Sequence, residues 1–221
     1  MTEELDVLRI VGERLESVGV PFMLTGSFAL GYYARPRMTR DLDFVVAMRA
    51  NDVDALVKAF AFDFYVDAEA VRAAVASQRI FNLMHLESAI KVDLIVRKDS
   101  DYRKIEFARR QAVEVAGVRT WITSREDLIL SKLVWARGHE MNDTAPDIQQ
   151  LITARYRNMT PDRRMRIASS MFETARAIVE SSLPAGLTGA ERRLALARRL
   201  YGGELPEAAL YAYAQRRESG A

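Results

Sequence analysis

The 221-residue sequence contains no cysteine and two histidines. The absence of cysteine excludes a disulfide framework, a thiolate nucleophile and a cysteine metal site. The histidines, His85 and His139, are isolated, so neither a zinc site nor a serine–histidine triad is supported. No apolar run approaches the roughly 18 to 20 residues that span a bilayer, and acidic residues stand where a signal peptide needs basic ones. We therefore expect a soluble, cytoplasmic protein without a membrane partner.

The chain also lacks an excess of charge of either sign. Lysine and arginine number 32 against 30 aspartate and glutamate residues, so the molecule as a whole carries no field that implies a nucleic-acid partner. The segment after Ala154 differs, because it holds twelve arginines and seven acids. Its arginine pairs suit an RNA backbone or solvated helix faces equally well: Arg163-Arg164, Arg192-Arg193, Arg198-Arg199 and Arg216-Arg217.

The pattern of apolar residues changes near residue 123. Residues 1–123 mix helical spacing with short apolar runs, whereas only helical patterns follow. The sequence predicts an α/β domain over 1–123 and a helical domain over 124–221. Asn51 and Asp67 are expected to cap the helices that follow them. Strands are expected at 20–24, 41–46, 62–66, 78–86, 90–96 and within 111–123, with 78–86 and 90–96 forming a hairpin.

Three aspartates interrupt strands that are otherwise apolar. Because side chains alternate across a strand, Asp41 and Asp43 share one face of 41–46 while the apolar residues take the other. Asp93 interrupts 90–96 in the same way, and the three carboxylates can converge if these strands are neighbours.

A cation explains such a pair of acids better than water does. Two carboxylates on one strand face repel each other unless water or a cation lies between them. Magnesium binds one or two carboxylates together with waters and substrate phosphates. The alternative is an edge strand with solvated acids, but nearly continuous apolar runs are typical of central strands.

Gly26 and Ser27 stand between an expected strand and an expected helix. Gly26 permits a ligand to approach the backbone closely, and the Ser27 hydroxyl and the free amides of the helix start can hold an anion such as phosphate. A phosphate cradle beside metal-binding carboxylates suits phosphoryl or nucleotidyl transfer, in which two metal ions stabilise the attacking and leaving oxygens.

The order of these motifs resembles the DNA polymerase β-like nucleotidyltransferase superfamily: Gly26-Ser27, thirteen residues, Asp41-Leu42-Asp43 and a later Asp93. More narrowly, GSFALGYYARPRMTRDLDFVV followed by SREDLILSKLVWA looks like the minimal bacterial nucleotidyltransferases of the abortive-infection (AbiE-type) toxin–antitoxin group. The resemblance covers residues 20–155. It implies an α+β fold, with a mixed-sheet nucleotidyltransferase core and flanking helices followed by a C-terminal helical module.

The resemblance also implies roles for single residues. Asp41 and Asp43 would hold two Mg²⁺ ions, with Mn²⁺ as a substitute, and Asp93 would help to hold the catalytic ion and activate the acceptor hydroxyl. Gly26 and Ser27 would bind a nucleoside triphosphate such as ATP. The acceptor would be tRNA or a protein hydroxyl, and a cognate antitoxin would be the partner.

Basic residues near these motifs are further candidates. Arg35, Arg37 and Arg40 lie between Ser27 and the aspartates, where they can neutralise a triphosphate or form a solvated loop. Arg40 is the candidate nucleotide-binding residue among them. The resemblance gives Lys132 a contact with phosphate or acceptor, and the alternative is a lysine that snorkels from an amphipathic helix.

The sequence thus predicts a magnesium-dependent nucleotidyltransferase. It would move a nucleoside monophosphate from an NTP to an acceptor hydroxyl and release pyrophosphate. A small-molecule acceptor, as in aminoglycoside-modifying relatives, stays open. The rival interpretation is a non-catalytic protein of the same fold that binds a nucleotide or a partner.

Overall fold

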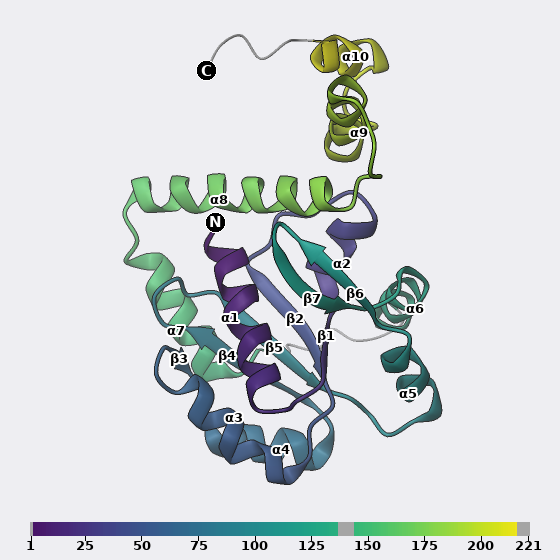
Figure 1. Ribbon diagram of the computed structural model, residues 1–221. Coiled ribbons are helices and arrows are strands. Elements are labelled where there is room, and N and C mark those ends of the chain that lie inside the picture. The colour runs from purple at the N-terminus through teal and green to yellow at the C-terminus, as the bar shows by residue number, and fades with distance from the viewer. Residues whose placement is uncertain (1, 137–143, 216–221) are drawn as a thin grey trace.

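The computed structural model describes residues 2–136 and 144–215. Within these residues, seven strands form one mixed sheet: β1 (Phe22–Leu24), β2 (Asp41–Val46), β3 (Phe64–Tyr65), β4 (Ile80–His85), β5 (Lys91–Val96), β6 (Gln111–Val115) and β7 (Val118–Ile122). Their order across the sheet is β3-β4-β5-β2-β1-β7-β6, which makes β2 the central strand (Figure 1). The β1–β7 and β2–β5 pairs are parallel, and the remaining neighbours are antiparallel.

Helices flank this sheet and then continue alone to the end of the described chain. They are α1 (Glu3–Ser17), α2 (Gly26–Tyr33), α3 (Val53–Phe60), α4 (Ala68–Ser77), α5 (Asp101–Ala108), α6 (Arg125–Ala136), α7 (Pro146–Arg157), α8 (Pro161–Ser181), α9 (Gly189–Tyr201) and α10 (Glu207–Gln215). In Figure 1, α8 lies across one end of the sheet, and α9 and α10 stand beyond it. This architecture confirms the predicted α+β class with C-terminal helices.

Several local predictions are confirmed and one is wrong. The strand at 41–46 and the hairpin of β4 and β5 form as expected, and Asp67 caps α4 by accepting hydrogen bonds from two backbone amides. Asn51 does not cap α3. Instead Asp52 accepts from the Arg49 N–H at 2.7 Å and closes a short 3-10 turn, Ala50–Asp52, ahead of that helix.

The main core lies between α1 and one face of the sheet, where α1 crosses in front of the strands (Figure 1). Its fully buried side chains, each about 1.5–3 kcal/mol more stable inside than exposed, include Leu8, Val11, Leu15, Leu42, Phe44 and Val46. The three residues from β2 occupy alternate positions and are all turned to this core. The opposite face of β2 therefore carries Asp41 and Asp43.

The arginines of the C-terminal helices make contacts inside the fold. Arg199 donates to three backbone carbonyls at the end of α2, at 2.8–3.1 Å. Arg192 and Arg193 donate to backbone carbonyls of α8 and α10. Arg216-Arg217, like His139, lies outside the described residues. RNA contact by this segment stays a prediction.

Among the residues that the structure describes, no helix combines the length and apolar character needed to span a membrane.

Candidate functional site

The sheet places the three predicted aspartates on one face. β2 and β5 run parallel with Asp43 opposite Asp93 and Asp41 opposite Lys91. We refer to these four residues as the carboxylate row. β4 flanks β5 on its other side and sets Asn82 opposite Asp93. Because β2 is central, the edge-strand explanation for its acids does not apply.

Gly26 lies directly against the carboxylate of Asp43. The Thr25 N–H donates to the Asp43 carbonyl at 2.8 Å, which brings the start of α2 alongside β2. Gly26 has a φ of +64°, and a Cβ at this position would lie 1.8 Å from Asp43 Oδ2, so only glycine fits. The backbone N–H of Ser27 donates to Asp43. The start of α2 thus holds the Asp43 carboxylate, and its predicted contact with phosphate stays a prediction.

Burial and like charges perturb Asp43 strongly. Burial, followed by repulsion from Asp93 and Asp41, raises the pKa of Asp43 from its ordinary 3.8 to about 7, against the opposing effects of Lys91 and Ser27. At neutral pH this carboxyl is therefore partly protonated. A nearby cation favours the charged form of a carboxyl, so the electrostatics of the row favour cation binding.

Asp93 is buried, with 6% of its surface exposed. Asn82 Nδ2 donates to its Oδ1 at 2.8 Å, and Lys91 Nζ donates to its Oδ2 at 2.8 Å. Burial raises the pKa of Asp93 although Lys91 opposes the shift. Burial by itself lowers the pKa of Lys91, but the surrounding aspartates raise it overall.

Sequence reasoning missed Lys91, Asn82 and Thr144. Lys91 Nζ also donates to Thr144 Oγ1 at 3.0 Å, and Thr144 lies 53 positions further along the chain. A signal for Lys91 was present, because it stands two residues before Asp93 and shares its strand face. Asn82 follows only once the register of the hairpin is known, and Thr144 follows only from the fold.

The row has oxygen donors of the kind that Mg²⁺ prefers. Within residues 2–136 and 144–215, however, no group of three or more His, Cys, Asp or Glu side chains is arranged to hold a metal ion. Both oxygens of Asp93 already accept hydrogen bonds. Asp41 is exposed, and a cation beside Asp43 would offset the burial and like-charge repulsion that raise its pKa. Asp41 and Asp43 therefore fit a divalent cation better than Asp93 does.

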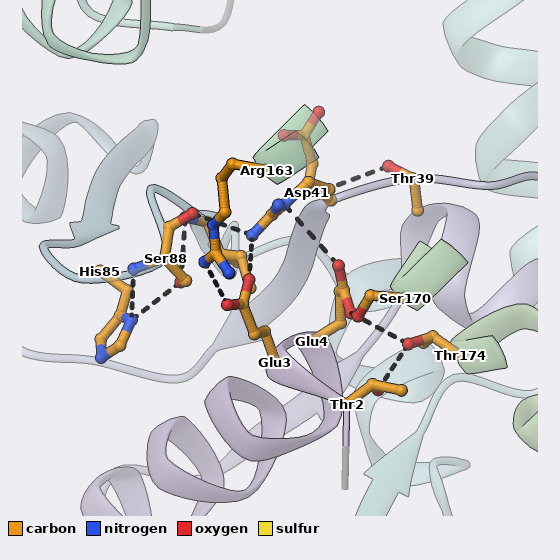
Figure 2. Close-up of polar contacts among 12 residues, drawn as sticks. Thr2, Glu3, Glu4, Thr39, Asp41, His85, Ser88, Arg163, Ser170 and Thr174 are labelled. Carbon is orange, nitrogen blue, oxygen red and sulfur yellow. Dashed lines mark hydrogen bonds and ion pairs between the residues drawn. The ribbon is translucent and has the colours of Figure 1, made fainter. Parts of the chain in front are cut away.

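Arg40 lies in a second polar group. Its Nη2 donates to Glu3 Oε2 and to a backbone carbonyl of the β4–β5 turn, both at 2.9 Å, and its Nε lies 3.7 Å from Glu4 Oε1. Figure 2 shows Glu3 turned to Arg163 of α8 and Glu4 turned to Ser170. We refer to Glu3, Glu4, Arg40 and Arg163 as the ion cluster. The nucleotide contact predicted for Arg40 gains no support from this arrangement.

Lys132 is exposed on α6. This helix packs against α2, whose first residues are Gly26 and Ser27. The contact of Lys132 with a ligand stays a prediction.

A cavity of about 250 Å³ adjoins the row on its β4 side. Its polar lining includes Tyr65, Asp67, Asn82, Thr144 and Asp147. The Tyr65 hydroxyl donates to Asp147 Oδ2 at 2.7 Å. Asn82 belongs to both places, because it lines the cavity and donates to Asp93. A molecule in the cavity would therefore lie one side chain away from Asp93.

Comparisons with known proteins find only weak structural similarity. No protein-family model matches this chain, and a search of curated proteins gives no significant match. Among solved structures, the chain is similar to TM1012 from Thermotoga maritima, a proposed nucleotidyltransferase, with a TM-score of 0.44 and 19% identity over 61% of this chain and 86% of that one. It is also similar to JHP933 from Helicobacter pylori, with a TM-score of 0.33 and 15% identity over 96% and 89% of the two chains.

Proposed function

We propose that this protein is a metal-dependent nucleotidyltransferase whose site is the carboxylate row. The observation that carries the proposal is the in-register pair of Asp43 and Asp93 on neighbouring parallel strands, with Gly26 packed against Asp43. Strongly perturbed carboxyl groups that converge on one face are typical of active sites. The sequence order of the glycine-serine turn and the three aspartates supports the same reaction class.

In the proposed reaction, Asp41 and Asp43 would hold the divalent cation, and Gly26 and Ser27 would bind the triphosphate at the start of α2. When bound, the cation would supply Lewis-acid stabilisation of charge on the phosphate oxygens. The acceptor oxygen attacks the α-phosphorus, the bond to the bridging oxygen of the β-phosphate breaks, and pyrophosphate leaves. Asp93 takes the proton of the acceptor hydroxyl, a role that suits a carboxylate whose pKa is raised by burial.

The direct test is transfer of label from each of the four α-labelled nucleoside triphosphates in the presence of Mg²⁺ and total RNA. We expect Asp41→Asn and Asp43→Asn to reduce transfer at least about 100-fold, since each removes a cation ligand. Asp101→Asn, which changes an exposed acid at the start of α5, is the matched control and should transfer normally. Unchanged transfer in both site variants would overturn the proposal. Nucleotide binding without transfer to any acceptor would favour the non-catalytic rival.

The finer prediction concerns the acceptor and the biological role. We propose tRNA or a protein hydroxyl as acceptor and a toxin–antitoxin setting, on the strength of the sequence resemblance. Label on RNA or on protein in the same experiment separates these acceptors. Growth arrest on expression, relieved by the product of a neighbouring gene, would support the toxin role, and normal growth would count against it.

The cavity beside Asp93 favours a second candidate, transfer to a small cationic molecule that carries hydroxyl groups. Asp67 and Asp147 give the cavity negative charge, and its volume suits one sugar-sized group. Aminoglycosides provide both features and can be tested as acceptors under the same conditions. We expect Asp147→Asn to raise the KM for such an acceptor and to leave the KM for the nucleotide unchanged. Equal changes in both KM values would contradict this assignment.

A further inference from the structure

Lys91 occupies the carboxylate row as a built-in cation. It stands opposite Asp41 in the β2–β5 register, and its ammonium group bonds Asp93 Oδ2 at 2.8 Å and Thr144 Oγ1 at 3.0 Å. Its side chain is 11% exposed. Since a lysine ammonium is strongly hydrated in water, these two acceptors replace part of the hydration that burial removes.

The ammonium occupies a position on Asp93 Oδ2 that a bound cation would otherwise use. One oxygen of Asp93 accepts from Asn82 and the other from Lys91. A divalent ion placed on Asp93 would meet a positive charge within hydrogen-bonding distance of its own ligand. Like charges this close repel strongly in a partly buried site. Asp93 is therefore already neutralised by the chain itself.

The formal charges of the row also favour one divalent cation over two. A bound cation favours the ionised form of a carboxyl, and with all three carboxylates ionised the row carries −3, which Lys91 reduces to −2. One divalent cation cancels the remainder, whereas two would leave an excess of positive charge before substrate arrives.

We propose that Lys91 takes the place of one of the two cations, so that the site binds a single divalent ion, held by Asp41 and Asp43. The proposal rests on the proposed function, because it concerns the cation of that reaction. It replaces the two ions that the resemblance implies by one metal ion and one ammonium group. Lys91 is thus a positioning residue that pairs with the Asp93 carboxylate at 2.8 Å.

The test is the ratio of bound Mn²⁺ to bound nucleotide. The full chain is dialysed to equilibrium against Mn²⁺ and an NTP analogue with an uncleavable α–β bridge, and both ligands are counted. We expect a ratio of about one for the wild type and about two for Lys91→Met, because loss of the ammonium opens Asp93 to a second ion. Lys104→Met, which changes an exposed lysine paired with Asp99, should keep the wild-type ratio.

The double variant Lys91→Met/Asp93→Asn provides an independent check, since it removes the ammonium and the carboxylate together. It should return the ratio to about one. A ratio near two in the wild type, or near one in Lys91→Met, would overturn the inference and leave the proposed function standing. The absence of any Mn²⁺-dependent nucleotide binding in the wild type would overturn both.

Discussion

The carboxylate row and the ion cluster meet at consecutive residues of the chain, Asp41 and Arg40, yet they balance their charges differently. The ion cluster matches two carboxylates, Glu3 and Glu4, with two guanidinium groups. The row sets three carboxylates against the one ammonium of Lys91. In the row, burial and like charges raise the pKa of Asp43 to about 7.

This difference separates a structural polar group from a candidate active site. The ion cluster joins the start of α1, the β4–β5 turn and α8, so each of its charges has a partner of opposite sign within the fold (Figure 2). Its pairing is by charge more than by hydrogen bonds, because Glu4 Oε1 and Arg40 Nε and Nη1 are buried without a hydrogen-bond partner among the residues that the structure describes. The row holds an excess of negative charge that costs stability in the isolated chain. A fold shaped by stability alone would neutralise such a group, and perturbed groups of this kind cluster at functional sites. We infer that the missing positive charge comes from a ligand.

Breaking the ion cluster should have the largest effect on stability. Arg40→Met leaves Glu4, which is fully buried, without its cation. Removing one partner of a buried ion pair typically costs about 3–5 kcal/mol, and we expect a loss of this size in urea-induced unfolding. Arg37→Met, in the exposed loop beside it, should change the free energy of unfolding by less than about 0.5 kcal/mol. A loss below about 1 kcal/mol for Arg40→Met would show that the ion cluster does not stabilise the fold.

Removing one carboxylate from the carboxylate row should instead stabilise the fold. The pKa of Asp43 is higher in the folded than in the unfolded chain, so between about pH 4 and pH 7 the folded state binds more protons and stability falls as pH rises. An asparagine side chain cannot titrate, and Asp43→Asn should therefore unfold with a free energy on the order of 2 kcal/mol higher at pH 8. The gain should vanish near pH 4. A destabilised variant at pH 8 would mean that the row is not electrostatically strained.

Arg163→Met tests the partly exposed pair of the ion cluster, Arg163 and Glu3. Arg163 and Glu3 are each about one-third exposed, and solvent screens such pairs. We expect a loss of about 1 kcal/mol in the same unfolding experiment, well below that for Arg40→Met. Equal losses for the two variants would mean that burial does not govern the strength of the cluster.

An ion pair on the protein surface should have the smallest effect on stability. Arg166 and Asp162 form an i,i+4 pair on α8, with 70% of each side chain exposed. Arg166→Gln should change the free energy of unfolding by less than about 0.5 kcal/mol, and 1 M salt should remove the difference. A larger effect that persists in salt would show that surface pairs contribute more than the screening argument allows.

Local features of the site could be predicted from the sequence. The alternation in DLDFVV placed Asp41 and Asp43 on one strand face, and the hairpin of β4 and β5 followed from its two apolar runs. The three aspartates were predicted to converge if their two strands were neighbours, and β2 and β5 do pair.

Long-range partners could not be predicted, because nothing in the local pattern encodes them. Arg40 reads as part of a basic loop until α1 brings Glu3 and Glu4 to it. Gly26 was expected to admit a ligand, whereas the folded chain also requires it to admit Asp43. Asn51 was misassigned for a local reason. It lies inside the 3-10 turn Ala50–Asp52, which the Asp52 carboxylate closes by accepting from the Arg49 N–H, so α3 begins only after it.

The most direct test of a cation site at the carboxylate row is the titration of Asp43, followed by carboxyl ¹³C NMR with the Asp43→Asn spectrum for assignment. In the absence of divalent ions, we expect a pKa of about 7. Saturating Mg²⁺ with an uncleavable NTP analogue should lower the pKa by at least about 2 units, because a bound cation favours the charged carboxylate. An ordinary pKa near 4 without metal, or a raised pKa that Mg²⁺ and nucleotide leave unchanged, would contradict the account.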